Sequence, residues 1–201
     1  MFVMPSMPVR NQCVSVAFHR QIFSTEECDR ILSSVDPNKW VEATVGGHGR
    51  DGGFARVEAV RSNRQQHVPM DTTGFPLNRI LAEVSTANSD GWKFELAGVV
   101  YDDFPWIMRY DEGGKGHYDW HVDIGQGANA SRKLGFTLQL SDGDSYRGGD
   151  LEFHNMNLDA PVLRKRGTLI AFPAYWLHRV APMTAGSRHA LVGWVHGPSF
   201  H

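Results

Sequence analysis

Two segments in the first half of the chain carry apolar residues at helical spacing. The first spans about residues 25–35, and its apolar stripe consists of Cys28, Ile31, Leu32 and Val35. Ser24 and Glu27 stand at the spacing of a capping box, in which each side chain caps the other residue's backbone N–H. The second spans about residues 76–85, opens with a proline suited to a first helical turn, and carries Leu77, Ile80, Leu81 and Val84. Both stripes predict amphipathic helices.

From residue 94 onward the pattern changes to short β-branched or aromatic runs separated by Gly, Asp, Asn and Pro. Such runs predict the strands of a sandwich or barrel. The expected strands are 94–101, 106–110, 134–140, 150–153, 168–172 and 189–195. We therefore expect a mostly β protein in which N-terminal helices over about 1–90 support a β core over about 91–201. The length of 201 residues suits a single domain, 1–201.

A segment rich in glycine and arginine, residues 45–68, lies between the two expected helices. It is either an ordinary surface loop or a lid that covers a substrate, because loops often carry function. Its arginines would either meet an acidic substrate or form a solvated face. They are Arg50, Arg56, Arg61 and Arg64.

Composition and charge exclude several classes of partner. The chain has 20 basic and 22 acidic residues and a formal charge of -2, which argues against a general attraction to nucleic acid. No apolar run approaches the roughly 20 residues that span a bilayer, and the first residues lack the pattern of a signal peptide. The two cysteines, Cys13 and Cys28, are too few for a disulfide scaffold and suit free thiols in a reducing compartment. We expect a cytoplasmic protein that binds neither nucleic acid nor membrane.

The candidate chemistry lies in the stretch GHYDWHVD, residues 116–123, which contains two overlapping pairs, His117-x-Asp119 and His121-x-Asp123. A non-haem iron site needs two histidines and one carboxylate, which leave the other coordination positions open. One His-x-Asp pair on a strand supplies two of these ligands. Because side chains alternate along a strand, all four residues would share one face, and geometry alone does not choose between the pairs.

A third ligand has to come from a distant strand, and His178 follows the expected strand 168–172. Arg188 stands ten residues later, at the start of the last strand. A guanidinium there could hold a dicarboxylate by paired N–H···O bonds, which a lysine cannot imitate. By spacing alone, a surface arginine in a turn is the commoner arrangement.

Three segments together resemble a known family: YDEGGKGHYDWHVD, LSDGDSYRGGDLEF and GTLIAFPAYWLHRVAPMTAGSRHALVGWV. They are similar to the iron(II)/2-oxoglutarate dioxygenases of the prolyl 4-hydroxylase superfamily, and within it to the PKHD-type hydroxylases. The resemblance covers roughly residues 100–197, and FSTEEC also resembles the N-terminal helix of that family. It implies a double-stranded β-helix core, also called a jelly roll or cupin-like fold, supported by helices.

The resemblance also implies the roles of individual residues. Family members carry a tyrosine about eleven residues before the metal-binding histidine, as Tyr110 stands before His121. The implied metal ligands are therefore His121, Asp123 and His178, with His117 and Asp119 just outside them. Arg188 and Tyr110 resemble residues that bind 2-oxoglutarate, and Gln139 stands where some relatives carry a second tyrosine. Candidate substrate contacts are Trp194, which shares strand parity with Arg188, together with Arg61 and His117.

The function implied is hydroxylation of a prolyl or other residue in a peptide or protein. It would depend on Fe(II), 2-oxoglutarate and O₂, with succinate and CO₂ as coproducts and ascorbate as a reductant. A free amino acid or another small molecule is the alternative substrate. An interpretation of another class is a non-catalytic β-sandwich module with a structural metal. Such a site is normally closed by a fourth protein ligand, for which His154 is the nearest candidate.

Overall fold

The structure of the protein is a computed structural model, and it describes residues 17–156 and 158–199. Most strands belong to two antiparallel sheets. The large sheet has the order β1 (Phe18–Gln21), β10 (Thr168–Pro173), β7 (Arg132–Gln139), β13 (Ser187–His196), β5 (Trp106–Asp111), β4 (Arg64–His67) and β2 (Val41–Glu42). The small sheet has the order β3 (Arg61–Ser62), β6 (His117–His121), β11 (His178–Val180) and β9 (Leu151–Phe153).

The remaining elements connect or cover these sheets. Strands β8 (Arg147–Gly148) and β12 (Met183–Ala185) form a short separate pair. The α-helices are α1 (Thr25–Ser33), α2 (Leu77–Asp90) and α3 (Ala160–Arg164). Four 3₁₀ turns complete the described chain: η1 (Arg50–Gly52), η2 (Tyr101–Asp103), η3 (Glu112–Gly114) and η4 (Gly127–Ser131).

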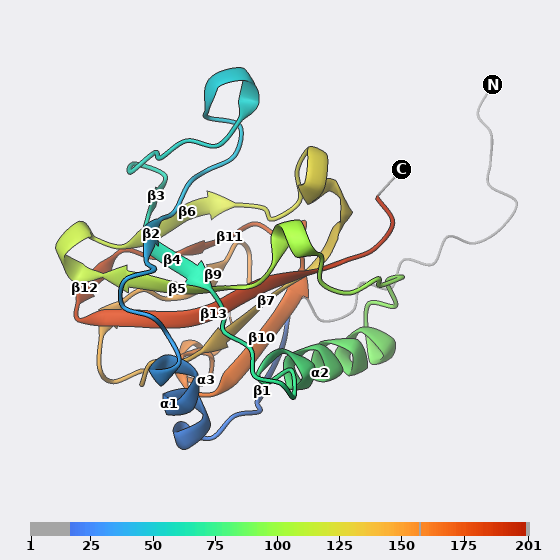
Figure 1. Cartoon of the computed structure of the whole chain (residues 1–201), viewed down its shortest axis with the longest axis horizontal. Helices are drawn as coiled ribbons and strands as arrows, with labels where there is room; N and C mark the ends of the chain where they lie inside the picture. Colours follow the sequence, from blue (N-terminus) through green and yellow to red (C-terminus); the bar gives the residue numbers. More distant parts are fainter. Residues whose placement is uncertain (1–16, 157, 200–201) are drawn as a thin grey trace, which may run out of the picture.

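The large sheet has two faces with different partners. One face packs against α1 and α2 in the main hydrophobic core, for example through Leu138 and Leu191 against Ile31 and Ile80. The opposite face meets the small sheet, where Phe172 packs with Phe153. Figure 1 shows both helices on one side of the large sheet and β6 and β11 on the other. Strand alternation therefore sends every second side chain of β13, β7 and β5 into the space between the sheets.

This arrangement confirms the expected jelly roll with supporting helices. The first helix is capped as expected, because the Ser24 hydroxyl accepts from the Glu27 N–H and the Glu27 carboxylate accepts from the Ser24 N–H. The second helix continues five residues beyond the expected end, to Asp90. Five of the six expected strands are present as β5, β7, β9, β10 and β13.

Two expectations about local structure were wrong. Residues 94–101 do not form a strand: Gly98 makes one isolated bridge to His196 with a φ of +113°, which interrupts the extended run. The region before residue 91 is not only helical either, because β1, β2 and β4 join the large sheet and β3 joins the small one. Their short, polar sequences, such as RQQH in β4, carry no apolar alternation that would reveal a strand.

The last part of the glycine- and arginine-rich segment, residues 61–62 and 64–67, is thus part of the sheets. Residues 45–58 project from the body of the protein beyond β3 (Figure 1), and Phe54 there is 71% exposed. Whether this projecting segment acts as a lid stays a prediction. Among the described residues, no helix has the length and apolar content needed to cross a membrane.

Cys28 is a free thiol buried in the core between α1 and the large sheet. Burial raises the pKa of Cys28 to about 11. Cys13, the other cysteine of the sequence, lies outside the described residues.

Candidate metal centre

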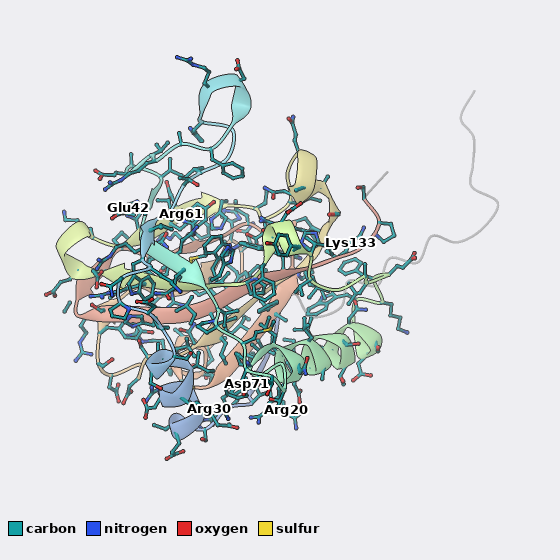
Figure 2. The ribbon with its side chains drawn as sticks, in the orientation of Figure 1. Arg20, Arg30, Glu42, Arg61, Asp71 and Lys133 are labelled. Carbon is teal, nitrogen blue, oxygen red and sulfur yellow. The ribbon has the colours of Figure 1, made fainter. Side chains whose placement is uncertain are left out.

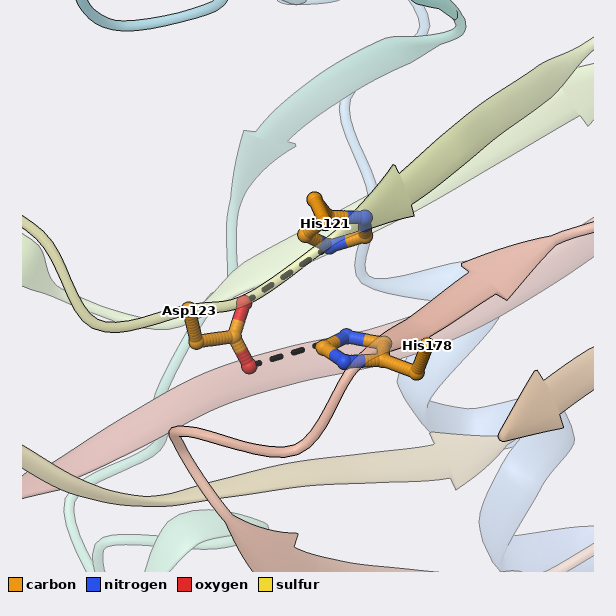
Figure 3. Close-up of side chains that lie close together, drawn as sticks. All are labelled: His121, Asp123 and His178. Atoms are coloured by element: carbon orange, nitrogen blue, oxygen red, sulfur yellow. Dashed lines mark ion pairs between the residues drawn. The ribbon is translucent and has the colours of Figure 1, made fainter. Parts of the chain in front are cut away.

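Three side chains from distant parts of the chain converge between the two sheets. His121 ends β6, Asp123 follows two residues later, and His178 begins β11, so that His178 and His121 are direct cross-strand partners. One ligand atom from each residue lies within 4.8 Å of the others. The Asp123 carboxylate lies 3.7 Å from Nε2 of His121 through Oδ1 and 3.7 Å from Nε2 of His178 through Oδ2 (Figure 3). We call these three residues the triad.

Backbone carbonyls fix the tautomer of both triad histidines. Nδ1 of His121 donates to the Asp119 carbonyl at 2.7 Å, and Nδ1 of His178 donates to the Trp176 carbonyl at 2.8 Å. A carbonyl only accepts, so each Nδ1 carries the proton and each Nε2 presents its lone pair. Burial, helped by the neighbouring His178, lowers the pKa of His121 to about 4. The triad therefore combines two imidazoles that present Nε2 with a carboxylate, the donor set of a non-haem Fe(II) site.

A β-bulge in β6 decides which residues accompany His121. His121 pairs with His178, but Tyr118 pairs with Val180, so three steps in β6 match two steps in β11. The extra residue reverses the alternation of side chains. As a result the Tyr118 ring stacks on the His121 ring at 3.5 Å between centroids. The expectation that His117 and Asp119 share the face of His121 was therefore wrong.

The backbone around Asp123 is held at both ends of the residue. Its N–H donates to the Ala174 carbonyl at 2.8 Å, in the loop that leads to His178. Its carbonyl accepts from Nη1 of Arg132 at 3.0 Å. Its carboxylate lies against Gly135 of β7, where an added Cβ would be 2.7 Å from Oδ2. Gly135 is thus needed for the close approach of the carboxylate to the sheet.

Arg188, Tyr110 and Gln139 lie together on the inner face of the large sheet. Arg188 pairs with Tyr110 across β13 and β5, and its guanidinium carbon lies 5.4 Å from the Tyr110 ring centroid. Its Nε donates to Oε1 of Gln139 at 3.1 Å. The Arg188 side chain is 1% exposed, yet its Nη2 has no hydrogen-bond partner among the described residues. A buried guanidinium with a free donor is costly without an acceptor, which suits an anion such as a carboxylate.

Trp194 lies on the same inner face as Arg188, six residues further along β13. It is 8% exposed, pairs with Gly135, and its Nε1 is buried without a partner among the described residues. The other candidates lie further from the triad. Arg61 bonds to Asn63, Gln65 and the Thr44 carbonyl and covers the far side of Tyr118 at 4.6 Å. Figure 2 shows it at the base of the projecting segment.

His117 and His154 are not part of the triad. The ring of His117 contacts the backbone oxygens of Lys115 and Ala59. The ring of His154 packs edge-on against Trp120 at 5.7 Å. Among the described residues, the clustered metal-ligand groups are the three of the triad, without His154. Two other arginines of segment 45–68 form ion pairs, Arg56 with Glu58 and Arg64 with Asp111.

Sequence reasoning missed three residues that shape this site: Tyr118, Arg132 and Gly135. A glycine inside an apolar strand, as in LGFTLQL, is a signal for close approach and could have identified Gly135. The contact of Tyr118 with His121 depends on the bulge in β6, and no local sequence pattern predicts that bulge. Arg132 reads in sequence as an ordinary charged residue at a strand start.

Comparisons with known proteins agree with this geometry. The family model of the 2OG-Fe(II) oxygenase superfamily matches residues 105–196. A PKHD-type hydroxylase of Synechococcus elongatus is 30% identical over 181 residues, which cover 87% of this chain and 75% of that protein. A PKHD-type hydroxylase of Synechococcus sp. (strain CC9311) is 40% identical over 81 residues, 40% of this chain. The alignment with that relative spans only 37% of its length.

Solved structures share the fold at low sequence identity. A prolyl hydroxylase from Trichoplax adhaerens superposes with a TM-score of 0.66 and 15% identity, over 90% of this chain and 83% of that one. A viral collagen prolyl hydroxylase from Paramecium Bursaria Chlorella virus-1 gives 0.62 and 15%, over 92% and 97%. A Pseudomonas putida prolyl-4-hydroxylase gives 0.60 and 16%, over 90% and 93%.

Proposed function

Because the chain belongs to the 2OG-Fe(II) oxygenase superfamily, and within it to the PKHD-type hydroxylases, we propose that it is an Fe(II)- and 2-oxoglutarate-dependent hydroxylase. The proposed substrate is a prolyl or other residue of a peptide or protein. Bound Fe(II), with 2-oxoglutarate and O₂, would supply the oxidising power to hydroxylate an unactivated C–H bond, with succinate and CO₂ as coproducts. The observation that carries this proposal is that the triad and the buried Arg188 face the same interior.

In this proposal the triad holds the metal. Nε2 of His121, Nε2 of His178 and the Asp123 carboxylate would bind it, and the described residues offer no fourth clustered ligand, which leaves positions for the cosubstrate and oxygen, as an oxygenase requires. The hydrogen bonds from each Nδ1 fix the tautomer and the orientation of the imidazoles. Tyr118 shields the outer face of His121 from water.

Arg188 would bind the distal carboxylate of 2-oxoglutarate. Its free Nη2 donates to that carboxylate, and Gln139 holds Nε so that the guanidinium plane keeps one orientation. Tyr110 lies beside the guanidinium and would donate its hydroxyl to the same group. Gln139 thus has a defined part in this proposal as an acceptor that orients Arg188.

A peptide or protein substrate is favoured by the surface next to the triad. Trp120 and Val122 flank His121 in sequence and are 38% and 42% exposed, and Tyr175, three residues before His178, is 45% exposed. Exposed aromatic and aliphatic side chains suit contact with another polypeptide. Trp194, with its unpaired indole N–H, is the proposed contact for the residue that is hydroxylated. The solved neighbour from Trichoplax adhaerens is a complex with a peptide fragment.

The test is release of succinate from 2-oxoglutarate by the purified protein, with Fe(II) and without any added substrate. We expect slow turnover in the wild type and none in His121→Ala, Asp123→Ala or His178→Ala. His117→Ala is the matched control and should retain turnover. No turnover in the wild type would favour a non-catalytic metal-binding module. Loss of metal in His117→Ala, with retention in His121→Ala, would show that the ligands are wrongly assigned.

The substrate class needs a second measurement. A panel of peptides and free amino acids, incubated with the enzyme, is analysed for a mass gain of one oxygen atom. A gain in peptides alone supports the proposal, and a gain in free amino acids alone contradicts it. Ascorbate as a reductant and a cytoplasmic location stay predictions; omission of ascorbate from the turnover assay tests the first and cell fractionation the second.

A further inference from the structure

Arg132, the first residue of β7, uses three of its nitrogen atoms in the interior beside the triad. Nε and Nη2 donate to the two carboxylate oxygens of Asp103 at 2.6 and 2.7 Å, and Nη1 donates to the Asp123 carbonyl at 3.0 Å. The side chains of Arg132 and Asp103 are 11% and 10% exposed. The planar guanidinium therefore has one orientation, and one of its edges holds the backbone of a triad residue.

The face of the same guanidinium holds Trp194. The guanidinium carbon lies 3.6 Å from the centroid of the Trp194 ring. A cation stacked on an indole at this distance is a favourable contact, and it is stronger when both groups are shielded from water. Trp194 in turn is the cross-strand partner of Gly135, which the Asp123 carboxylate touches. Arg132 therefore contacts both the backbone of Asp123 and the Trp194 ring, whose strand partner Gly135 lies against the Asp123 carboxylate.

Asp103 is itself held in place. It ends the turn η2, and its Oδ2 also accepts from Nε2 of His196 at 3.1 Å. His196 is 2% exposed at the end of β13, and its Nδ1 lies 2.9 Å from the Ser131 hydroxyl, next to Arg132. The three segments 101–103, 131–132 and 194–196 are thus joined in a closed ring of contacts. A ring of this kind resists a small shift of any one member.

From these contacts we infer that Arg132 is a positioning residue for the metal centre, with Asp103 as its partner. The inference rests on the proposed function. Asp123 lies beyond the end of β6, in a stretch without ladder hydrogen bonds, so the bonds to Ala174 and Arg132 are what fix its backbone. Asp103 adds a second effect: its negative charge balances the guanidinium, which would otherwise repel a bound cation.

The test is the affinity of the purified protein for Mn(II), a stand-in for Fe(II) that does not oxidise in air, measured by titration calorimetry. Arg132→Lys keeps the positive charge but loses the fork that reaches Asp103 and Asp123 together. Loss of a contact that orients a metal ligand typically weakens binding about 10- to 100-fold, and we expect a loss in this range. Thermal unfolding of each metal-free variant shows whether it is folded.

The control is Arg166→Lys. Arg166 makes similar contacts, to the Asp29 carboxylate and the Leu140 carbonyl, but at the helix-covered side of the sheet. It should bind Mn(II) like the wild type. The inference would be overturned if both variants lost Mn(II) affinity equally. It would also be overturned if Arg132→Lys bound Mn(II) within about threefold of the wild type, instead of the expected loss of about 10-fold or more. If Arg132→Lys does not fold, Asp103→Asn decides by the same thresholds.

This design separates the inference from the proposed function on which it rests. A wild-type protein that does not bind Mn(II) would remove the proposed metal site itself. A wild type that binds, together with an Arg132→Lys variant that binds equally well, would remove only the positioning role of Arg132.

Discussion

Gly135 lies in the middle of β7, and a methyl group at this position has no free space. An alanine Cβ would be 2.7 Å from Oδ2 of Asp123 and 2.9 and 3.0 Å from two ring carbons of Phe172. Ordinary contacts of a Cβ begin at 3.4 Å, so the carboxylate would have to move by 0.7 Å, the difference between 3.4 and 2.7 Å. The backbone of Gly135 does not require glycine, because its φ lies outside the left-handed region.

The size of the effect follows from what can move. Phe172 is 2% exposed and packs against Phe153 and Ile170, so displacing its ring has the cost of an overpacked core, about 1–3 kcal/mol. The Asp123 carboxylate is the end of a side chain and yields more easily. A binding group tolerates a misplacement of only about 0.5 Å. We therefore expect Gly135→Ala to weaken metal binding about 10- to 100-fold, which corresponds to about 1.4–2.8 kcal/mol of binding free energy.

The assay combines calorimetric titration of Mn(II) with thermal unfolding of the metal-free protein. Gly193→Ala is the matched control, because Gly193 precedes Trp194 on β13 and faces the other side of the sheet. A Cβ at Gly193 would be 2.6 Å from Phe136 and 2.7 Å from Pro105. It should lower the melting temperature, at about 2–4 °C per kcal/mol for a chain of this size, and leave Mn(II) affinity unchanged. Wild-type Mn(II) affinity in Gly135→Ala would refute the reasoning, and so would equal losses of affinity in both variants.

Two further predictions follow from single residues. Arg188→Lys should raise the 2-oxoglutarate concentration needed for half-maximal succinate formation by about 10- to 100-fold, since a charged hydrogen bond contributes about 1.5–3 kcal/mol. The affinity of this variant for Mn(II) should stay unchanged. An unchanged 2-oxoglutarate requirement would remove the cosubstrate role of Arg188. Burial, followed by the charge of Arg109, lowers the pKa of His189 from 6.5 to about 4. Between pH 6.5 and about pH 4, His189 is therefore protonated in the unfolded chain but not in the folded chain. Its contribution to stability is complete above pH 6.5 and is lost as the pH falls to about 4. Because His189 is partly exposed, we expect it to account for about 1–3 kcal/mol of the stability lost on acidification. Urea unfolding at pH 7.5 and 4.5 should therefore show a correspondingly smaller loss of unfolding free energy in His189→Gln than in the wild type. Equal losses in the two proteins would contradict this.

Much of the fold could be predicted from the sequence because its elements carry a local signal. Helix α1 has both an apolar stripe and a capping box, and the strands of the β core have dense β-branched or aromatic residues. The short strands β2, β3 and β4 have no such signal, since their pairing depends on neighbours far along the chain. The run 94–101 looks like a strand by composition, but a single glycine with a positive φ prevents it.

The site divides in the same way. Spacing and family resemblance lead to His121, Asp123, His178 and Arg188, because the chemistry of the metal and of the cosubstrate dictates these residue types. The structure brings the first three together and places Arg188 behind them in the same interior. The supporting residues depend on three-dimensional packing instead. Arg132 acts on Asp123 only because Asp103, 29 positions earlier, lies beside it, and no local pattern connects the two.

The bulge in β6 gives the strand one residue more than its pairing with β11 requires, so the centre can accept a change in chain length at this point. Removing one codon between Tyr118 and His121 would let β6 pair regularly with β11 and would keep every triad side chain in the protein. The imidazole would still lie opposite His178 and on the same face of the small sheet, because directly paired residues of antiparallel strands point to the same side. During evolution, a three-base deletion there could therefore remove the extra residue of the bulge while His121 and His178 stay side by side.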